Sequence, residues 1–308
     1  MSEIQGKETA GRSRLRSSRN LLATIVCVWM VTACASGHHE PFPGDLPQVR
    51  SLAAVEERLQ RALAATPSLS METIGTVAYG AFQGPIWEIV RQPKGTAEYT
   101  VLIAAGIHGN EPAGVETLLQ FVDTLAGDAG AYPGYVFHII PIVNPWGWAH
   151  DIRFNAGGVD VNRDFSTFAS QESKTISRFL AGKRYDLMVD LHEDPSGKGF
   201  YIYQYARPDR RVCEDVIRRI RTMGYPIEQD VNMVILRTED GIIDAPRSGL
   251  WYMKLTGQLS LTNYFRLIHS DRVYTVETPT VLPWNDRLTM HRTALVELLR
   301  GLAEDNPH

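Results

Sequence analysis

The chain has 308 residues, of which 44% are hydrophobic and 21% are charged, and its formal net charge is −4. This composition is typical of a globular protein with enough apolar side chains for a large core, and it excludes a fibrous or a disordered chain. The acidic balance argues against nucleic acid as a partner, because nucleic-acid binding needs a basic surface.

The amino terminus has the features of a targeting segment. Five basic residues precede an apolar run, 21–33, that is too short to span a bilayer as a helix. We predict that residues 1–33 are a signal peptide. Small residues immediately before Cys34 resemble a bacterial lipoprotein box, in which cleavage precedes the cysteine and the cysteine receives lipid; an ordinary secretory signal with an incidental cysteine is the alternative. Ala35, where an acidic residue would favour inner-membrane retention, indicates the outer membrane, facing the periplasm.

The remaining chain is predicted to hold one domain. Residues 34–48 form a polar tether, and residues 49–308 have the length and composition of one large α/β domain. Removal of residues 1–33 takes away five basic and two acidic residues, so the formal net charge falls to −7. Cys213 then has no partner for an internal disulfide, and we expect a buried structural thiol. We expect a monomer that does not bind nucleic acid.

Hydrophobic periodicity predicts an alternation of strands and helices along this domain. The predicted elements are, in chain order, a helix at 49–65, a hairpin of strands at 72–78 and 86–91, a strand from 101 to the break at Gly106, a helix at 112–125, a strand at 135–143, a helix at 171–180, strands at 185–191 and 200–203, a helix at 208–223, strands at 232–236 and 273–277, and a helix at 284–302. Residues 241–270 show no assignable pattern. We predict an α/β fold with a mixed, mostly parallel twisted sheet flanked by helices.

Polar side chains that can bind a metal, transfer a proton or form hydrogen bonds lie at or after the ends of several predicted strands. His108 and Glu111 follow the first buried strand, His192 and Glu277 end two later strands, and Asn144 follows another. The carboxyl ends of parallel strands lie at the same edge of a sheet, where ligands bind in open α/β folds. We therefore expect these side chains to gather at one edge.

Two imidazoles and one carboxylate are a common catalytic zinc set, in which a fourth position is left for water or substrate. His108, Glu111 and His192 would supply it, and we expect one zinc ion, which lowers the pKa of bound water toward ~7. Glu277 is the candidate general base, which passes the proton of water to the leaving nitrogen. Arg153 could polarise the scissile carbonyl and stabilise the oxyanion.

Each of these signals has a simpler interpretation when it is taken alone. Most His-x-x-Glu pairs are neighbours on a helix surface, and a histidine after a strand is usually a hydrogen-bonded loop residue. Glu277 could cap a helix or pair with Arg287, and Arg163 could pair with Asp160 or Asp164. Their joint occurrence at strand ends favours the metal site, although the same ligands also suit other divalent metals.

The sequence resembles the zinc carboxypeptidase family, in which His-x-x-Glu and a later His bind zinc and a Glu in a late strand is the general base. The run from Gly158 to Phe165, Gly-Val-Asp-Val-Asn-Arg-Asp-Phe, is similar to that family's signature and lies in the family's order. The resemblance implies that Asn162 and Arg163 bind a terminal carboxylate and that Asp160 steadies the first zinc histidine. It also implies the carbonyl-polarising role for Arg153.

Three departures separate the chain from the digestive carboxypeptidases. His192 is followed by Glu193 and Asp194, the signature ends in Asp164 and not Asn, and the family's mobile tyrosine has two rival positions, Tyr252 and Tyr264. The short gaps and the phrase Arg-Phe-Asn-Ala-Gly-Gly-Val-Asp resemble the murein peptide amidases and the succinylglutamate desuccinylase-like deacylases more closely.

These expectations describe a lipid-anchored periplasmic zinc hydrolase, a carboxypeptidase or amidase that cleaves an amide next to a carboxylate-bearing residue. Peptidoglycan stem peptides suit that location, with ordinary peptides and N-acyl amino acids as alternatives. A metal- or peptide-binding lipoprotein without catalytic activity is the alternative of another class. The presence of Glu277 together with all three ligands favours the enzyme.

Overall fold

The computed structural model describes residues 39–128, 130–205, 210–229, 232–233, 236–245 and 247–304. The predicted signal peptide and Cys34, the predicted site of lipid attachment, lie outside the described residues. Among the helices described, none is both long enough and apolar enough to cross a membrane.

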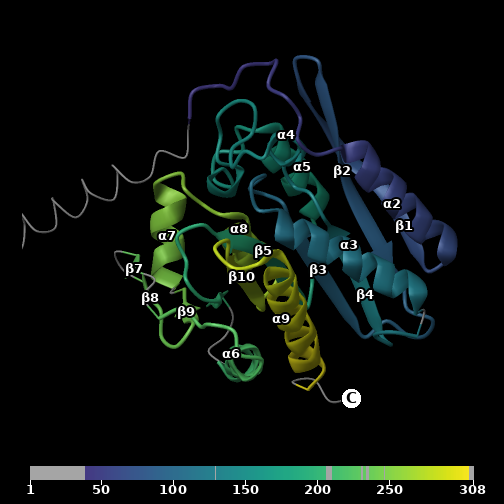
Figure 1. Ribbon diagram of the computed structural model, residues 1–308, viewed down its shortest axis with the longest axis vertical. Coiled ribbons are helices and arrows are strands. Elements are labelled where there is room, and N and C mark those ends of the chain that lie inside the picture. The colour runs from purple at the N-terminus through teal and green to yellow at the C-terminus, as the bar shows by residue number, and fades with distance from the viewer. Residues whose placement is uncertain are drawn as a thin grey trace, which may run out of the picture. The chain divides into compact units, whose positions relative to one another are not determined.

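Eight strands form one mixed sheet (Figure 1). They are β1 (Leu69–Tyr79), β2 (Phe82–Arg91), β3 (Tyr99–Ala105), β4 (Tyr135–Ile140), β5 (Leu187–Asp194), β6 (Tyr201–Gln204), β9 (Ile242–Asp244) and β10 (Val273–Pro279). Their order across the sheet is β1-β2-β4-β3-β5-β10-β6-β9. The four central strands β4, β3, β5 and β10 are parallel, whereas β2 pairs antiparallel with β4 and β6 pairs antiparallel with β10. The strands β7 (Asn232–Met233) and β8 (Leu236–Arg237) form a separate short hairpin.

Helices cover both faces of the sheet. They are α2 (Leu52–Ala65), α3 (Pro112–Gly127), α4 (Pro145–His150), α5 (Gln171–Leu180), α6 (Arg211–Thr222), α7 (Arg247–Leu255), α8 (Leu261–Ile268) and α9 (Trp284–Glu304). One hydrophobic core joins the sheet to α2, α3, α6 and α9, and Figure 1 shows α2, α3 and α9 on the near face. A second core on the opposite face includes side chains of α5 and α8.

The central strands have apolar side chains on both faces because both faces are covered. In β3, Val101 and Ile103 belong to the core beneath α3 and α9, while Leu102 and Ala104 belong to the core beneath α5 and α8. This burial explains why β3 is a continuous apolar run in the sequence and not an alternating one. The predicted α/β fold with a mixed sheet flanked by helices is confirmed.

Most predicted elements are present in the described residues, with three differences. The strand predicted at 135–143 ends at Ile140, and α4 follows, which the turn signal at Asn144 did not indicate as a helix. The strand predicted at 232–236 consists of β7 and β8. Residues 241–270, which had no assignable pattern, contain β9, α7 and α8.

Two features outside the site also have defined places. Cys213 is buried, as expected, and its thiol donates to Gln204 Oε1 at 3.2 Å. The described part of the expected tether, residues 39–48, contacts the loop before the signature: His39 N donates to Gly158 O at 2.6 Å, and Phe42 N donates to Ala156 O at 3.0 Å.

Candidate metal centre

The turn that carries the first two candidate ligands is held tightly against a neighbouring helix. β3 ends at Ala105, and a Cβ atom on Gly109 would lie 1.9 Å from the carbonyl carbon of Gly147 in α4. Only glycine therefore fits between His108 and Glu111 at this position. Glu111 is the N-cap residue of α3, and Pro112 occupies the first helical turn, where its missing N–H does no harm.

Strand register brings the remaining site residues into one row. His192 on β5 pairs with Glu277 on β10, and Glu277 pairs with Tyr201 on β6. Directly paired residues share a face of the sheet, so these three side chains lie side by side on the face covered by α5 and α8. His192 and Glu277 lie within the last three residues of their strands, at the predicted edge of the sheet.

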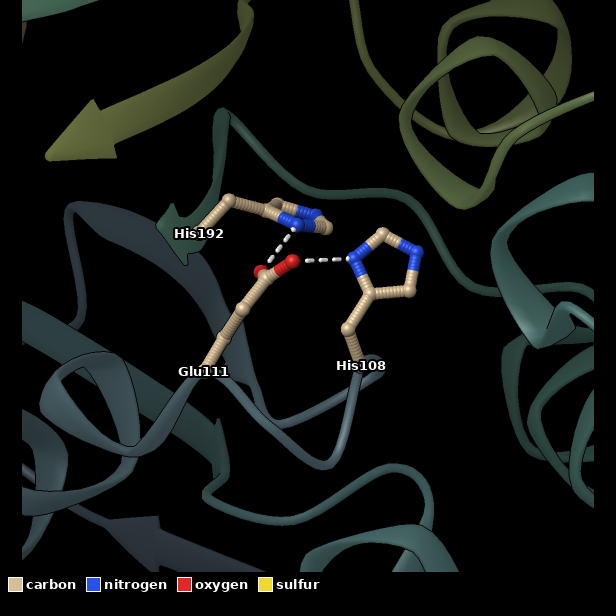
Figure 2. Close-up of side chains that lie close together, drawn as sticks. All are labelled: His108, Glu111 and His192. Carbon is tan, nitrogen blue, oxygen red and sulfur yellow. Dashed lines mark hydrogen bonds and ion pairs between the residues drawn. The ribbon is translucent and has the colours of Figure 1, made fainter. Parts of the chain in front are cut away.

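The three candidate ligands converge on one another (Figure 2). Glu111 lies between the two imidazoles: its Oε1 is 2.6 Å from His108 Nδ1, and its Oε2 is 2.9 Å from His192 Nδ1. One ligand atom from each side chain lies within 4.8 Å of the other two, and all three residues are buried. The structure thus brings together the three residues that the sequence singled out.

Carboxylates behind the two imidazoles orient the rings. His108 Nε2 is 3.2 Å from Asp160 Oδ1, and His192 Nε2 is 3.0 Å from Asp190 Oδ2. An Nε2–H that donates to a carboxylate leaves Nδ1 with its lone pair directed toward Glu111, which is the tautomer that a metal ligand requires. Asp160 therefore lies where the family resemblance implies, and Asp190 is an equivalent partner of His192 that the sequence interpretation missed.

The electrostatics of this cluster fit a cation. Burial alone would raise the pKa of Glu111, but His108 and His192 lower it well below its ordinary value. Burial alone would lower the pKa of His192, but Asp190 and Glu111 raise it well above its ordinary value. A metal at this site would use the same Nδ1 lone pair of His192 that a proton occupies, so a divalent cation and a proton compete for it. The donor set and its outer carboxylates fit a divalent metal such as zinc.

Arg153 is fixed beside the ligands by a carboxylate. Its Nε and Nη2 donate to Asp160 Oδ2 at 3.1 and 2.9 Å. The remaining Nη1 lies 3.3 Å from His108 Nδ1 and 3.5 Å from Glu111 Oε1. One edge of the guanidinium is thus held by Asp160, and the other edge faces the candidate ligands His108 and Glu111. Asp160 orients both the histidine and the arginine.

Glu277 is a carboxyl group with an altered proton affinity. Burial raises the pKa of Glu277 to about 8, and Glu111 and Asp194 add to the rise, whereas His192 and Arg153 oppose it. A carboxyl group with a raised pKa can both accept and donate a proton near neutrality, which is the property of a general acid–base catalyst. Arg287, the alternative partner of Glu277, instead contacts Glu193 at 2.6 Å.

A cavity of about 650 Å³ opens over the cluster. Asn162 and Arg163 line it together with the three ligands, Arg153 and Glu277. Asn162 Oδ1 accepts the N–H of Leu261 at 3.0 Å, so its amide group is held in place. The Arg163 side chain donates to the carbonyl of Asn162 at 2.8 Å, and within the described residues it forms no hydrogen bond with the carboxylate of Asp160 or Asp164. Both residues are placed to meet a substrate group in the cavity.

The departures from the digestive enzymes have different locations. Asp164 accepts the N–H groups of Ala169 and Ser170, at 2.9 and 2.8 Å, and it does not line the cavity, so this change belongs to the scaffold. Tyr252 and Tyr264 do not line the cavity either, and the Tyr264 hydroxyl contacts Ser177 at 3.1 Å.

Three tyrosines do line the cavity: Tyr201 and Tyr203 on β6, and Tyr205 directly after it. Their alternation with Ile202 and Gln204 places all three on the face that carries Glu277, since side chains two apart on a strand share a face. The same spacing of two relates Asp190 to His192. A period of two on a predicted strand was therefore the signal in the sequence that could have identified these residues.

Comparisons with known proteins agree with this geometry. Residues 97–233 match the family described as the Succinylglutamate desuccinylase/Aspartoacylase catalytic domain. Murein peptide amidase A of Escherichia coli strain K12 is 31% identical over 120 residues, which cover 39% of this chain and 44% of that protein. Carboxypeptidase SOL1 of Arabidopsis thaliana is 28% identical over 228 residues, which cover 58% and 46%. The matches thus span less than half the length of these two relatives.

Solved structures share the fold at low sequence identity. A candidate metallopeptidase from Shewanella amazonensis has a TM-score of 0.66 with 21% identity, covering 82% of this chain and 93% of that one. A metallo-carboxypeptidase from Burkholderia cenocepacia has a TM-score of 0.63 with 18% identity, covering 83% and 70%. The predicted resemblance to the metallocarboxypeptidases and murein peptide amidases is therefore confirmed, with residues 97–233 matching the Succinylglutamate desuccinylase/Aspartoacylase catalytic domain family.

Proposed function

We propose that the protein is a zinc-dependent hydrolase, a carboxypeptidase or amidase that cleaves an amide bond next to a carboxylate-bearing residue. The observation that carries the proposal is the placement of Glu277 in register with His192, in one cavity with the His108–Glu111–His192 cluster and two arginines. A binding protein needs no carboxyl group of raised pKa at this position, whereas amide hydrolysis needs a group that accepts and returns a proton.

The chain supplies both binding and proton transfer. Arg163 and Asn162 bind the carboxylate on the leaving side of the substrate, because a guanidinium and an amide N–H group are strong donors to carboxylate oxygens. This places the scissile carbonyl toward Arg153, whose Nη1 faces the ligand cluster and stabilises the negative charge that develops on the carbonyl oxygen.

Glu277 then moves the proton. It accepts a proton from the attacking water as the water oxygen bonds to the carbonyl carbon, and it returns that proton to the nitrogen as the carbon–nitrogen bond breaks. His108, Glu111 and His192 would hold the zinc ion, and zinc, when bound, supplies Lewis acidity and a water of lowered pKa. The Asp160 and Asp190 carboxylates keep the two imidazoles in the required tautomer.

We propose peptidoglycan stem peptides as the substrate class. The similarity to murein peptide amidase A supports this choice, as does a cavity that combines cations with carboxylates such as Asp194. Hydroxyl and amide side chains of Ser260, Thr262 and Asn263 add neutral hydrogen-bonding groups, which suit a polar diamino acid better than an apolar one. Incubation with purified muropeptides should release diaminopimelate, detected by mass; release from no muropeptide would overturn this choice of substrate.

N-acyl amino acid deacylation is the second candidate activity, because residues 97–233 match the desuccinylase and aspartoacylase catalytic domain. The two activities differ in the acyl group and share the carboxylate on the leaving side. Parallel assays with N-succinyl and N-acetyl amino acids and with muropeptides separate them. Binding of these compounds with hydrolysis of none would instead support the alternative of a non-catalytic binding protein.

We also propose that the mature protein is anchored to the outer membrane, facing the periplasm, through lipid on Cys34. The support is the sequence alone: a basic segment, a short apolar run and small residues before the cysteine. Cys34→Ser should block lipid attachment and signal processing. Unchanged processing and an unchanged membrane fraction would contradict the anchor.

A further inference from the structure

Glu193 lies beside a candidate ligand but on the other face of the sheet. It follows His192 directly on β5, and side chains of consecutive strand residues point to opposite faces. The Glu193 side chain is fully buried, between the start of α3 and the first turns of α9. An acidic side chain buried to this extent needs partners that compensate for its lost hydration.

Glu193 makes three hydrogen bonds, one of which is to the candidate ligand Glu111. Its Oε1 accepts Arg287 Nη1 at 2.6 Å, and its Oε2 accepts the backbone N–H of Ala113 at 2.7 Å. Its own backbone N–H donates to Glu111 Oε2 at 3.1 Å. Glu193 therefore contacts three parts of the molecule: the first turn of α3, Arg287 on α9, and the carboxylate of Glu111 in the ligand cluster.

The start of α3 explains why this connection is needed. The N-cap residue of a helix ordinarily turns its own side chain back to accept a free N–H of the first turn. Glu111 is the N-cap residue here and makes no such bond, because its carboxylate faces His108 and His192. Glu193 supplies the acceptor from another strand, and its negative charge suits the amino-terminal end of the helix dipole.

We propose that Glu193, held by Arg287, is a positioning residue that caps α3 in place of Glu111 and so keeps the Glu111 carboxylate available to the metal. The inference rests on the proposed function only in taking His108, Glu111 and His192 as metal ligands. Without Glu193, the free N–H of Ala113 is an alternative donor for the Glu111 carboxylate, and the metal competes with it.

Zinc affinity of the purified protein tests this role directly. Competition with a chromogenic chelator gives the zinc Kd of the wild type and of Glu193→Leu and Glu193→Gln. We expect Glu193→Leu to weaken zinc binding by roughly 10- to 100-fold, the range for partners that orient metal ligands. Glu193→Gln keeps an oxygen acceptor for Ala113, so it should restore affinity to within about fivefold of the wild type.

A matched control separates positioning from loss of stability. Arg58 on α2 contacts Glu116 on α3 at 2.9 Å, an ion pair on the same helix away from the ligands. Arg58→Met should change the melting temperature and leave the zinc Kd unchanged. Equal zinc affinity in Glu193→Leu and the wild type would overturn the proposal, and so would an equal loss in Glu193→Gln and Glu193→Leu. A wild-type protein that binds no zinc would instead overturn the proposed function.

Discussion

The two faces of the β5–β10 strand pair differ sharply at neighbouring positions. His192 and Glu277 are register partners that line the cavity. Glu193 lines it too, but the side chains of the next pair, Glu193 and Thr278, contact α9. The side chains on the cavity side include the candidate metal ligand His192 and the candidate general base Glu277. On the other side Glu193 pairs with Arg287, and the Thr278 hydroxyl contacts His291 Nε2 at 3.0 Å. Adjacent residues on one strand thus have different roles: one side chain belongs to the candidate site, and the next packs against α9 and supports it.

Substitutions on the two faces should differ most in their effect on kcat. Glu277→Gln keeps the shape of the side chain and removes its capacity to accept a proton, so kcat should fall by roughly 10²- to 10⁴-fold. Zinc affinity should change little, since Glu277 is not among the clustered ligands. The measurement is kcat on any peptide or acyl amino acid that the wild type cleaves. Thr278→Val on the other face is the control and should lower kcat less than about threefold.

Substrate binding should depend on the guanidinium in the cavity. Arg163→Met should raise KM by roughly 10- to 100-fold, because a hydrogen bond to a charged group contributes about 1.5–3 kcal/mol. The effect on kcat should be small, since Arg163 does not contact the ligand cluster. Steady-state kinetics on matched substrates with a free and an amidated carboxylate give the test. An equal loss on both substrates would show that Arg163 does not bind the carboxylate.

Metal affinity should depend on the carboxylates behind the imidazoles. Asp190→Asn retains an oxygen that can accept from His192 Nε2 but loses the charge, so zinc should bind roughly 10-fold more weakly, at the lower end of the range for such partners. Asp186→Asn provides a control directly before the start of the same strand, where Asp186 Oδ2 accepts the N–H of Thr100 at 2.7 Å. A zinc affinity that falls in step with stability in both variants would contradict a role for Asp190 in orientation.

The last expected effect is a pH dependence of stability in the metal-free protein. The pKa of Glu277 is raised to about 8, above its unfolded value of about 4.3. The folded state therefore holds a proton that the unfolded state loses, and this contribution is complete below pH about 4.3 and lost as pH rises through 8. Denaturant unfolding from pH 5 to 8 should show a steeper loss of stability in the wild type than in Glu277→Gln. Parallel profiles would indicate that Glu277 is ionised in the folded state.

The candidate ligands and the general base could be predicted from the sequence, but the residues that support them could not. His108, Glu111, His192 and Glu277 could be identified because each ends or follows an apolar run, and together they mark the sheet edge where ligands bind in open α/β folds. Their convergence could also be predicted, since parallel strands end at one edge. Distances between side chains could not, because they depend on register and on turns such as the one at Gly109.

The support residues were missed for a related reason. Glu193 and Asp190 lie inside or beside an apolar run. Arg287, the partner of Glu193, is far away in the sequence, whereas Asp190 lies two residues before its partner His192 on the same strand. A pairing between residues that are 94 positions apart has no local signal in one sequence. Residues 241–270 were not assigned because their short elements, β9, α7 and α8, have ends set by tertiary packing and not by periodicity.

Zinc titration of the metal-free protein by calorimetry tests the central claim most directly, in parallel with His192→Ala. The cluster of two imidazoles around Glu111 should bind one zinc ion per chain, and binding should release a proton, since zinc displaces it from His192, whose pKa is raised. Affinity should therefore rise with pH, and His192→Ala should lose the high-affinity site. Absence of stoichiometric binding by the wild type, or binding that is unchanged in His192→Ala, would contradict the metal centre.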